Sequence, residues 1–265
     1  YDVSFDLRAR EQVRRADFIG RDLVIVLGGD GTLTSISHNI DAETPVIGVN
    51  SHPIDDDPNG SFGFYMDSNI DTFSADIITA LSGKAIINQI PRLQAIIDTT
   101  SGNRFTTDPA MNDLLIANTH QYAPSKYHLR REGKKCRQQS SGLVFSTWLG
   151  QGAWLNHIID QNTIDNLRKN IQDNQINNHY FVVAREISHK QRIDHPWSWL
   201  DWTDQTTTIT SDMHRGYVVP DGWDEVHFNR GATITVNLAA PKLCLLTFRK
   251  TIYEKLSELI EQKLV

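Results

Sequence analysis

The sequence contains few cysteines, no long apolar run and no excess of basic residues. With only Cys136 and Cys244 in 265 residues, a disulfide framework is excluded and a reducing cytoplasm is the default expectation. No apolar run approaches the length of a membrane span, and no signal peptide is visible. The formal net charge of -6 argues against a nucleic-acid partner, which usually meets a basic surface. Because the chain starts at Tyr1 rather than Met, a mitochondrial location stays open if a leading segment precedes it.

The length and composition are those of a globular protein with one large or two modest domains. Hydrophobic residues make up 39% and charged residues 22% of the 265 residues. A chain of this size can bury a sizeable core without disulfides. Two domains are what the change of sequence pattern along the chain predicts.

The first third of the chain alternates between strand and helix patterns. Short apolar runs rich in β-branched residues and bounded by glycine are typical of buried parallel strands. The predicted elements are a helix over 5–18, a strand over 23–27, a helix over 33–39, a strand over 45–50 and a helix over 71–81. This alternation predicts an α/β, Rossmann-like domain over residues 1–88.

After Gly83 the pattern changes to many short strand-like runs separated by turn residues. These runs cover 86–100, 114–117, 143–145, 180–183, 206–210, 233–238 and 243–248. They predict a mostly antiparallel β-sandwich over residues 89–249, interrupted by a polar helical insertion near 157–174. An amphipathic helix is expected over 252–264, and we expect residues 250–265 to pack back on the first domain.

A glycine-rich turn, Gly28-Gly29-Asp30-Gly31-Thr32, follows the first predicted strand and precedes a predicted helix. Glycine lets the backbone approach a ligand closely, and a helix N-terminus favours phosphate. An aspartate cannot bind phosphate directly, but it can accept a proton from an attacking hydroxyl or hold magnesium. The turn therefore predicts a phosphotransfer site, although a tight turn in which Asp30 or Thr32 caps the helix stays open.

This turn lacks the Gly-Lys-Ser/Thr ending of a P-loop, and its glycines are too close together for a dinucleotide-binding fingerprint. It resembles the Gly-Gly-Asp-Gly-Thr motif shared by the NAD kinases and the diacylglycerol/sphingosine lipid kinases. The motif alone does not separate these two families.

Further stretches resemble the NAD kinases, and together they span residues 22–248. They are the strand at 45–50 with the Gly-x-x-Gly-Phe element at 60–64, the Asn-Asp pair leading into a strand at 111–116, the strand at 141–147 continuing through Gly150, Ala153 and Trp154, and the Val-Pro-Asp-Gly turn at 219–222. Three positions depart from the family pattern. Asp113 stands where the family has Glu, Ser141 where it has Asp, and 148–152 replaces a Pro-Thr-Gly-Ser-Thr turn. Residues 140–143, the pair Ala153-Trp154, the helical insertion after them and the extended loop at 50–53 resemble the divergent mitochondrial-type branch. The lost carboxylate at Ser141 implies an altered choice between NAD and NADH or a different nucleoside.

The resemblance implies ATP-dependent transfer of a phosphoryl group to the adenosine ribose 2′-hydroxyl of NAD, with Mg²⁺. Asp30 would be the base, and phosphate would meet Gly28, Gly29, Gly31 and Thr32. The implied NAD-binding residues are Asn112, Asp113, Ser141, Thr147, Gly152, Ala153 and Trp154. No residue is assigned as a metal ligand. A homodimer or homotetramer is implied, while the donor, ATP or polyphosphate, stays open.

Several alternatives remain at this point. A lipid kinase would use the same glycine turn, and a catalytically silent nucleotide-binding protein would account for the changes at Ser141 and 150–152. Asn112 and Asp113 could instead be a structural turn before a strand. For Trp197, Trp199 and Trp202 we expect packing against the sheet or a partner subunit, and the basic pairs at 130–131 and 134–135 are expected to flank a hairpin turn.

Overall fold

The computed structural model describes residues 3–262 and divides into two compact units. The first unit is made of two segments of the chain, the residues up to Ile90 and Lys242–Glu261. The second unit covers Pro91–Pro241. The first is an α/β unit and the second is built from antiparallel sheets, which confirms the predicted fold class.

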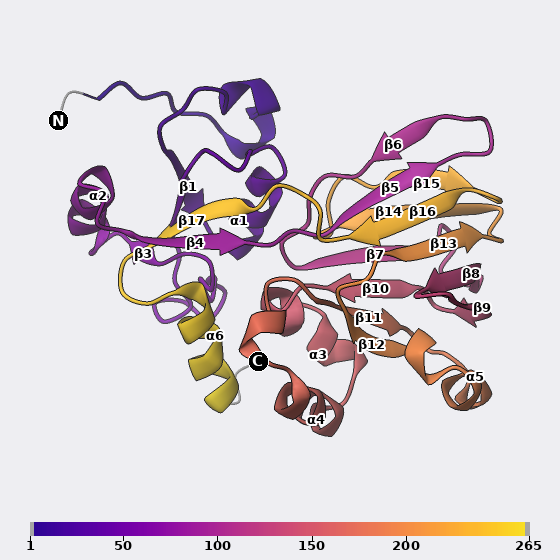
Figure 1. Cartoon of the computed structure of the whole chain (residues 1–265). Coiled ribbons are helices and arrows are strands. Elements are labelled where there is room, and N and C mark those ends of the chain that lie inside the picture. Colours follow the sequence, from indigo (N-terminus) through magenta and orange to yellow (C-terminus); the bar gives the residue numbers. More distant parts are fainter. Residues whose placement is uncertain (1–2, 263–265) are drawn as a thin grey trace. The chain divides into compact units, whose positions relative to one another are not determined.

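The first unit is organised around a short, mostly parallel sheet in the strand order β1-β2-β17-β4, with β3 paired to β2 (Figure 1). Its strands are β1 (Val24–Gly28), β2 (Val46–Asn50), β3 (Ser68–Asn69), β4 (Ile86–Ile90) and β17 (Leu243–Thr247). Its helices are α1 (Asp30–Ser37), α2 (Phe73–Leu81) and α6 (Ile252–Glu261). Every residue of β2 is buried, as expected for a strand covered on both faces.

The helix predicted over 5–18 is wrong. This segment holds only the 3-10 turns η1 (Arg10–Gln12) and η2 (Arg15–Asp17), and neither contains a buried residue. Phe5 and Leu7 are 86% and 81% exposed. A short helix is marginal in water unless an apolar face packs on something, and of the apolar side chains in this segment only Phe18 is buried.

The sheet topology differs from the expectation that 243–248 belongs to the β-rich domain. β17 pairs in parallel with β2 and antiparallel with β4, so it completes the sheet of the first unit. All five residues of β17 are buried. A continuous apolar run of this kind is typical of a doubly covered α/β strand, whereas strands of a sandwich alternate between core and solvent.

The second unit consists of two six-stranded antiparallel sheets. One sheet has the order β12-β11-β10-β7-β14-β15, from Leu200–Thr203, Tyr180–Ala184, Leu143–Ser146, Asp113–Asn118, Arg215–Pro220 and Val226–Asn229. The other has the order β6-β5-β16-β13-β8-β9, from Arg104–Thr106, Gln94–Asp98, Thr233–Asn237, Thr207–Ser211, Ser125–Arg131 and Lys134–Ser140. Buried side chains from both sheets form one continuous core. The β8–β9 hairpin confirms the turn expected between the two basic pairs.

The helical insertion of the second unit is two helices rather than one, and they lie beside β10–β12 (Figure 1). Helix α3 covers Leu155–Ile158 and α4 covers Gln161–Asn170. Asp160 separates them, because its carboxylate accepts the backbone N–H of Thr163 and so begins a new helix. A short helix, α5 (His189–Asp194), precedes β12.

The tryptophans of the 197–202 segment pack inside the second unit, as expected. Trp202 stacks on His179 and contacts Phe181, and Trp199 lies under the guanidinium of Arg192. Across residues 3–262, no helix has both the length and the apolar character needed to cross a membrane.

Helix α6 is joined to the sheet of the first unit through the buried side chain of Asn88. The Asn88 amide nitrogen donates to the carbonyl of Leu245 at 3.2 Å and to the hydroxyl of Thr247 at 2.9 Å. Its amide oxygen accepts the first helical N–H, that of Ile252, at 2.9 Å. The Asn88 side chain is therefore hydrogen-bonded both to β17 and to the first turn of α6.

We expect Asn88→Leu to lower the free energy of unfolding by about 1–3 kcal/mol, because it leaves buried polar groups without partners. Gln89→Leu, at the exposed neighbouring position of the same strand, should change it by less than about 0.5 kcal/mol. Urea denaturation measures both. Equal effects of the two variants would show that the Asn88 side chain does not join the two elements.

Candidate active site

In the first unit, β1 ends at Gly28 and α1 begins at Asp30, three residues earlier than the sequence pattern predicts. Gly29 is the N-cap residue in an extended conformation, and its carbonyl accepts the N–H groups of Thr32 and Leu33 at 2.9 and 3.2 Å. Asp30 therefore lies in the first helical turn, where the field of the helix favours negative charge.

The Asp30 carboxylate is oriented by hydrogen bonds from a second loop, Ser61–Tyr65. Its Oδ1 accepts the backbone N–H of Tyr65 at 2.8 Å, and its Oδ2 accepts that of Phe64 at 2.9 Å. The hydroxyl of Ser61 donates to Oδ2 at 3.3 Å and accepts the N–H of Asp30 at 3.2 Å. The Gly-x-x-Gly-Phe element at 60–64 thus has a local role, because its backbone fixes the carboxylate of the glycine-rich turn.

The three glycines of the turn differ in what surrounds them. A β-carbon at Gly28 would lie 2.5 Å from the hydroxyl of Thr32, and one at Gly29 would lie 2.7 Å from the Ser61 side chain. Around Gly31 a β-carbon would meet no described atom within 4 Å. Packing therefore requires the first two glycines, whereas Gly31 is exposed and free of any steric requirement within the protein.

In the second unit, the carboxylate of Asp221 binds the backbone of Met111, Asn112 and Asp113. It accepts their N–H groups at 2.8, 2.8 and 3.1 Å. The N–H of Asp221 in turn donates to the carbonyl of Asp113 at 2.9 Å. This places Asp221, from the turn after β14, against the Asn-Asp pair that precedes β7, two segments more than a hundred residues apart in the chain.

Thr147 and Gly150 approach the same backbone from the end of β10. The Thr147 hydroxyl donates to the carbonyl of Met111 at 2.6 Å and accepts the N–H of Gly150 at 3.0 Å. The Thr147 N–H donates to the carbonyl of Asn112 at 2.9 Å. A β-carbon at Gly150 would lie 2.1 Å from that same oxygen, so only glycine fits there. Thr147 is 1% exposed, and its hydroxyl is used within the protein.

Asp113 lies on the face of its sheet that points away from the sandwich core. It pairs with Ser146 across β7 and β10 and shares its face with Leu115 and Ala117, against which Trp154 packs. Asp113 is 7% exposed. Burial, assisted by the negative charge of Asp221, raises the pKa of Asp113 to about 7. Near neutral pH this carboxyl exists in both forms, so it can donate or accept a hydrogen bond.

Ser141 and Trp154 are linked through Arg185 at the edge of the same face. The N–H of Ser141 donates to the carbonyl of Arg185 at 2.9 Å, and the Arg185 guanidinium lies 5.3 Å from the centre of the Trp154 ring. The Ser141 hydroxyl donates to the carboxylate of Glu186. Ser141 thus has a carboxylate as its hydrogen-bond partner, supplied by the turn that follows β11. Gly152 and Ala153, before Trp154, are exposed.

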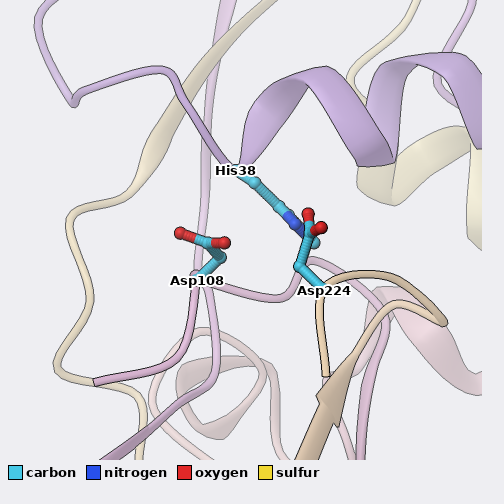
Figure 2. Close-up of side chains that lie close together, drawn as sticks. All are labelled: His38, Asp108 and Asp224. Atoms are coloured by element: carbon cyan, nitrogen blue, oxygen red, sulfur yellow. The ribbon is translucent and has the colours of Figure 1, made fainter. Parts of the chain in front are cut away.

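Two exposed carboxyl groups of the second unit, those of Asp108 and Asp224, lie close to one another, with oxygen atoms within 4.8 Å (Figure 2). Figure 2 also labels His38, the C-cap residue of α1 in the first unit. Two exposed carboxylates alone do not define a cation site, so no metal ligand is assigned.

The sequence predicts roles for Asp30, Asn112 and Asp113 but not for the residues that orient them. Ser61, Gly150 and Asp221 were visible only as parts of turn patterns. The signal for Asp221 was its place in a Pro-Asp-Gly turn, where aspartate often binds nearby backbone N–H groups. Nothing in the sequence says that its partners lie at Met111–Asp113, because that pairing depends on the register between β7 and β14.

The raised pKa of Asp113 predicts a pH dependence of stability. The folded state keeps the proton up to about pH 7, whereas the unfolded chain releases it near the ordinary pKa of 3.8. The contribution of protonated Asp113 to the free energy of unfolding is therefore complete below about pH 4. It is lost as the pH rises toward 7, by up to about 1.4 kcal/mol per pH unit. Asp113→Asn should remove that slope, which urea denaturation between pH 4.5 and 8 measures. Parallel curves for the two proteins would contradict the raised pKa.

The comparisons with known proteins agree on one family. Residues 4–74 match the model of the ATP-NAD kinase N-terminal domain. The NAD kinase of Pseudomonas fluorescens (strain SBW25) is 28% identical over 50% of this chain and 43% of its own length. The NAD kinase of Thermoplasma volcanium is 21% identical over 93% of this chain and 81% of its own. A probable NADH kinase of Oryza sativa subsp. japonica is 31% identical over 50% and 44%. The chain therefore spans less than half the length of the Pseudomonas and rice relatives.

Solved structures show the same fold. Yeast NADH kinase complexed with NADH superposes with a TM-score of 0.68 at 17% identity, covering 91% of this chain and 66% of that one. An NAD kinase from Archaeoglobus fulgidus in complex with ATP gives a TM-score of 0.64 at 14% identity, covering 91% and 82%. Residues 4–74 thus match the ATP-NAD kinase N-terminal domain, and over most of its length the chain is similar to NAD kinases and an NADH kinase in sequence and in fold.

Proposed function

We propose that this protein is an NAD kinase, which transfers a phosphoryl group from ATP to the adenosine ribose 2′-hydroxyl of NAD or NADH. The observation that carries the proposal is the Asp30 carboxylate, which lies at a helix N-terminus and is fixed by the N–H groups of Phe64 and Tyr65. Beside it, Gly31 is a glycine that packing does not require. A fixed carboxylate next to an open backbone suits an attacking hydroxyl and an incoming phosphate.

Asp30 would act as the base for the hydroxyl. A carboxylate has about four acceptor sites, and Oδ1 of Asp30 uses one of its two for the N–H of Tyr65. The remaining site can accept the hydroxyl proton without breaking the hydrogen bonds that orient the group. Phosphoryl transfer depends mainly on positioning and charge neutralisation, so a fixed geometry is the main requirement. The donor phosphates would be received at Gly28, Gly29, Gly31 and Thr32.

The second unit would bind the dinucleotide. An amide beside a carboxyl that can both donate and accept suits a ribose diol, and Asn112 and Asp113 are such a pair. Trp154, partly buried on the same sheet face as Asp113, has the flat surface needed to stack on a base. Thr147 and Gly150 would act by fixing the backbone of Asn112, while Ser141, Gly152 and Ala153 complete the set of nucleotide contacts.

The phosphoryl donor would be ATP, which would enter with its Mg²⁺ as part of the substrate, and polyphosphate is the alternative donor. A homodimer or homotetramer is part of the proposal. Both cysteines of the chain are free and buried, which suits a reducing compartment such as the cytoplasm or the mitochondrial matrix. The acceptor assay must include diacylglycerol and sphingosine, because lipid kinases share the glycine turn.

Asp30→Asn should leave the protein folded and lower kcat for NADP formation by about 10²–10⁴-fold, since the amide cannot take the hydroxyl proton. The measurement is steady-state formation of NADP or NADPH, with melting temperature and NAD affinity as controls. Asp71→Asn, an exposed carboxylate of the same unit, should have wild-type turnover. Near-normal turnover by the Asp30 variant would exclude Asp30 as the base.

Gly31→Ala separates function from folding. The added methyl meets no described atom, and replacing glycine in a helix stabilises it by up to about 1 kcal/mol, so the melting temperature should stay equal or rise. The methyl would stand where the phosphate approaches, so kcat/KM should fall by at least about tenfold. Gly29→Ala is the structural contrast, since its methyl would collide with Ser61. Wild-type kinetics for Gly31→Ala would mean that no ligand approaches this position.

A further inference from the structure

The peptide group between Gly63 and Phe64 links the Asp30 carboxylate to a lysine of the last helix. Its N–H, that of Phe64, donates to Oδ2 of Asp30 at 2.9 Å. Its carbonyl oxygen, that of Gly63, accepts a hydrogen bond from Nζ of Lys255 at 2.8 Å. One planar peptide unit therefore transmits the position of the Lys255 ammonium directly to Asp30.

This peptide group needs a restraint on its carbonyl side. Gly63 has φ +70°, in the left-handed region, and a β-carbon there would lie 2.5 Å from Nδ2 of Asn50. Glycine permits this backbone, but it also permits rotation of the adjoining peptide. A rotated peptide would turn its carbonyl oxygen toward the Asp30 carboxylate and withdraw the Phe64 N–H. The ammonium of Lys255 opposes that rotation, because it binds the oxygen on the opposite side.

Helix α6 presents Lys255 from a fixed position. Its first N–H is bound by the buried side chain of Asn88, and Ile252, Leu256 and Leu259 of the helix are buried. The hydroxyl of Thr251 and the carboxylate of Glu254 accept one another's backbone N–H, which caps the first turn. The backbone of Lys255 is therefore held at a defined place within the first unit, from which its ammonium reaches the Gly63 carbonyl.

The surroundings of Lys255 also favour a charge-assisted bond. The side chain is half-buried, and burial lowers the pKa of Lys255, with the nearby charge of Arg249 acting in the same direction. The negative charges of Asp67 and Asp30 raise it, which indicates that the ammonium and the Asp30 carboxylate interact through a partly desolvated region. Hydrogen bonds in series polarise one another in such surroundings, so the cation strengthens the N–H bond to Asp30.

We propose that Lys255 is a positioning residue for phosphoryl transfer, which holds the Gly63–Phe64 peptide in the orientation that directs the Phe64 N–H at Asp30. This rests on the proposed kinase function. It assigns a role in turnover to the C-terminal helix, although none of the residues implied in catalysis or binding lies in that helix.

The test compares Lys255→Met with Lys255→Arg. Methionine keeps the apolar stem and removes the charge, whereas arginine restores a donor. Lys250→Met is the matched control, since Lys250 lies just before α6 and pairs with Glu258 at 2.5 Å on the surface. We expect Lys255→Met to lower kcat by about tenfold or more, with KM for NAD nearly unchanged, and Lys255→Arg to recover part of the loss. If Lys255→Met does not fold, Lys255→Gln takes its place.

A second readout does not depend on activity. Amide hydrogen exchange of Phe64, followed by NMR, should be faster in Lys255→Met than in the wild type, and unchanged in Lys250→Met. Wild-type kcat in Lys255→Met overturns the proposal, and so does a loss of kcat with unaltered exchange at Phe64. If the wild type phosphorylates no NAD while exchange at Phe64 still responds to Lys255, the proposed kinase function fails and the positioning of Asp30 by Lys255 stands.

Discussion

The geometry of the glycine-rich turn depends on the hydrogen bonds between the Asp30 carboxylate and the backbone N–H groups of Phe64 and Tyr65. A carboxylate in the first turn of a helix would otherwise rotate freely or cap its own helix. Here a separate loop fixes it, and that loop can approach only because a side chain is missing at Gly29. The glycines of the turn and the position of the loop therefore act together, and they fix the orientation of the Asp30 carboxylate.

In the second unit a carboxylate also accepts backbone N–H groups, but here the carboxylate orients the backbone. The Asp221 carboxylate orients the backbone of Met111–Asp113, and the residues it orients carry the groups that would contact ligand. Burial raises the pKa of Asp113, and the charge of Asp221 adds to this effect, so the same residue orients its neighbour and influences its protonation. In both units a carboxylate bound to backbone N–H groups converts a turn of several residues into a rigid arrangement, which catalysis by positioning requires.

Most of the architecture could be predicted because it depends on local patterns. The run at Val24–Gly28, the glycine-rich turn and the alternating strands of the sandwich each carry their own signal. The helix expected over 5–18 did not form because Phe5 and Leu7 have no apolar surface to pack on, which no local window reveals. The position of Leu243–Thr247 in the first sheet could not be predicted from its apolar run, because β10 and β11 of the sandwich are buried at every position as well. Asp221 and Lys255 could not be predicted, because their partners are set by strand register and by how α6 packs within its unit.

The central claim is the identity of the phosphorylated atom. Purified wild-type protein with magnesium–ATP and a panel of NAD, NADH, diacylglycerol and sphingosine, analysed by mass and by ³¹P NMR of the product, tests it directly. We expect a single new phosphomonoester on the 2′-oxygen of the adenosine ribose of NAD or NADH. A phosphorylated lipid, or NAD that is bound but never phosphorylated, would contradict it.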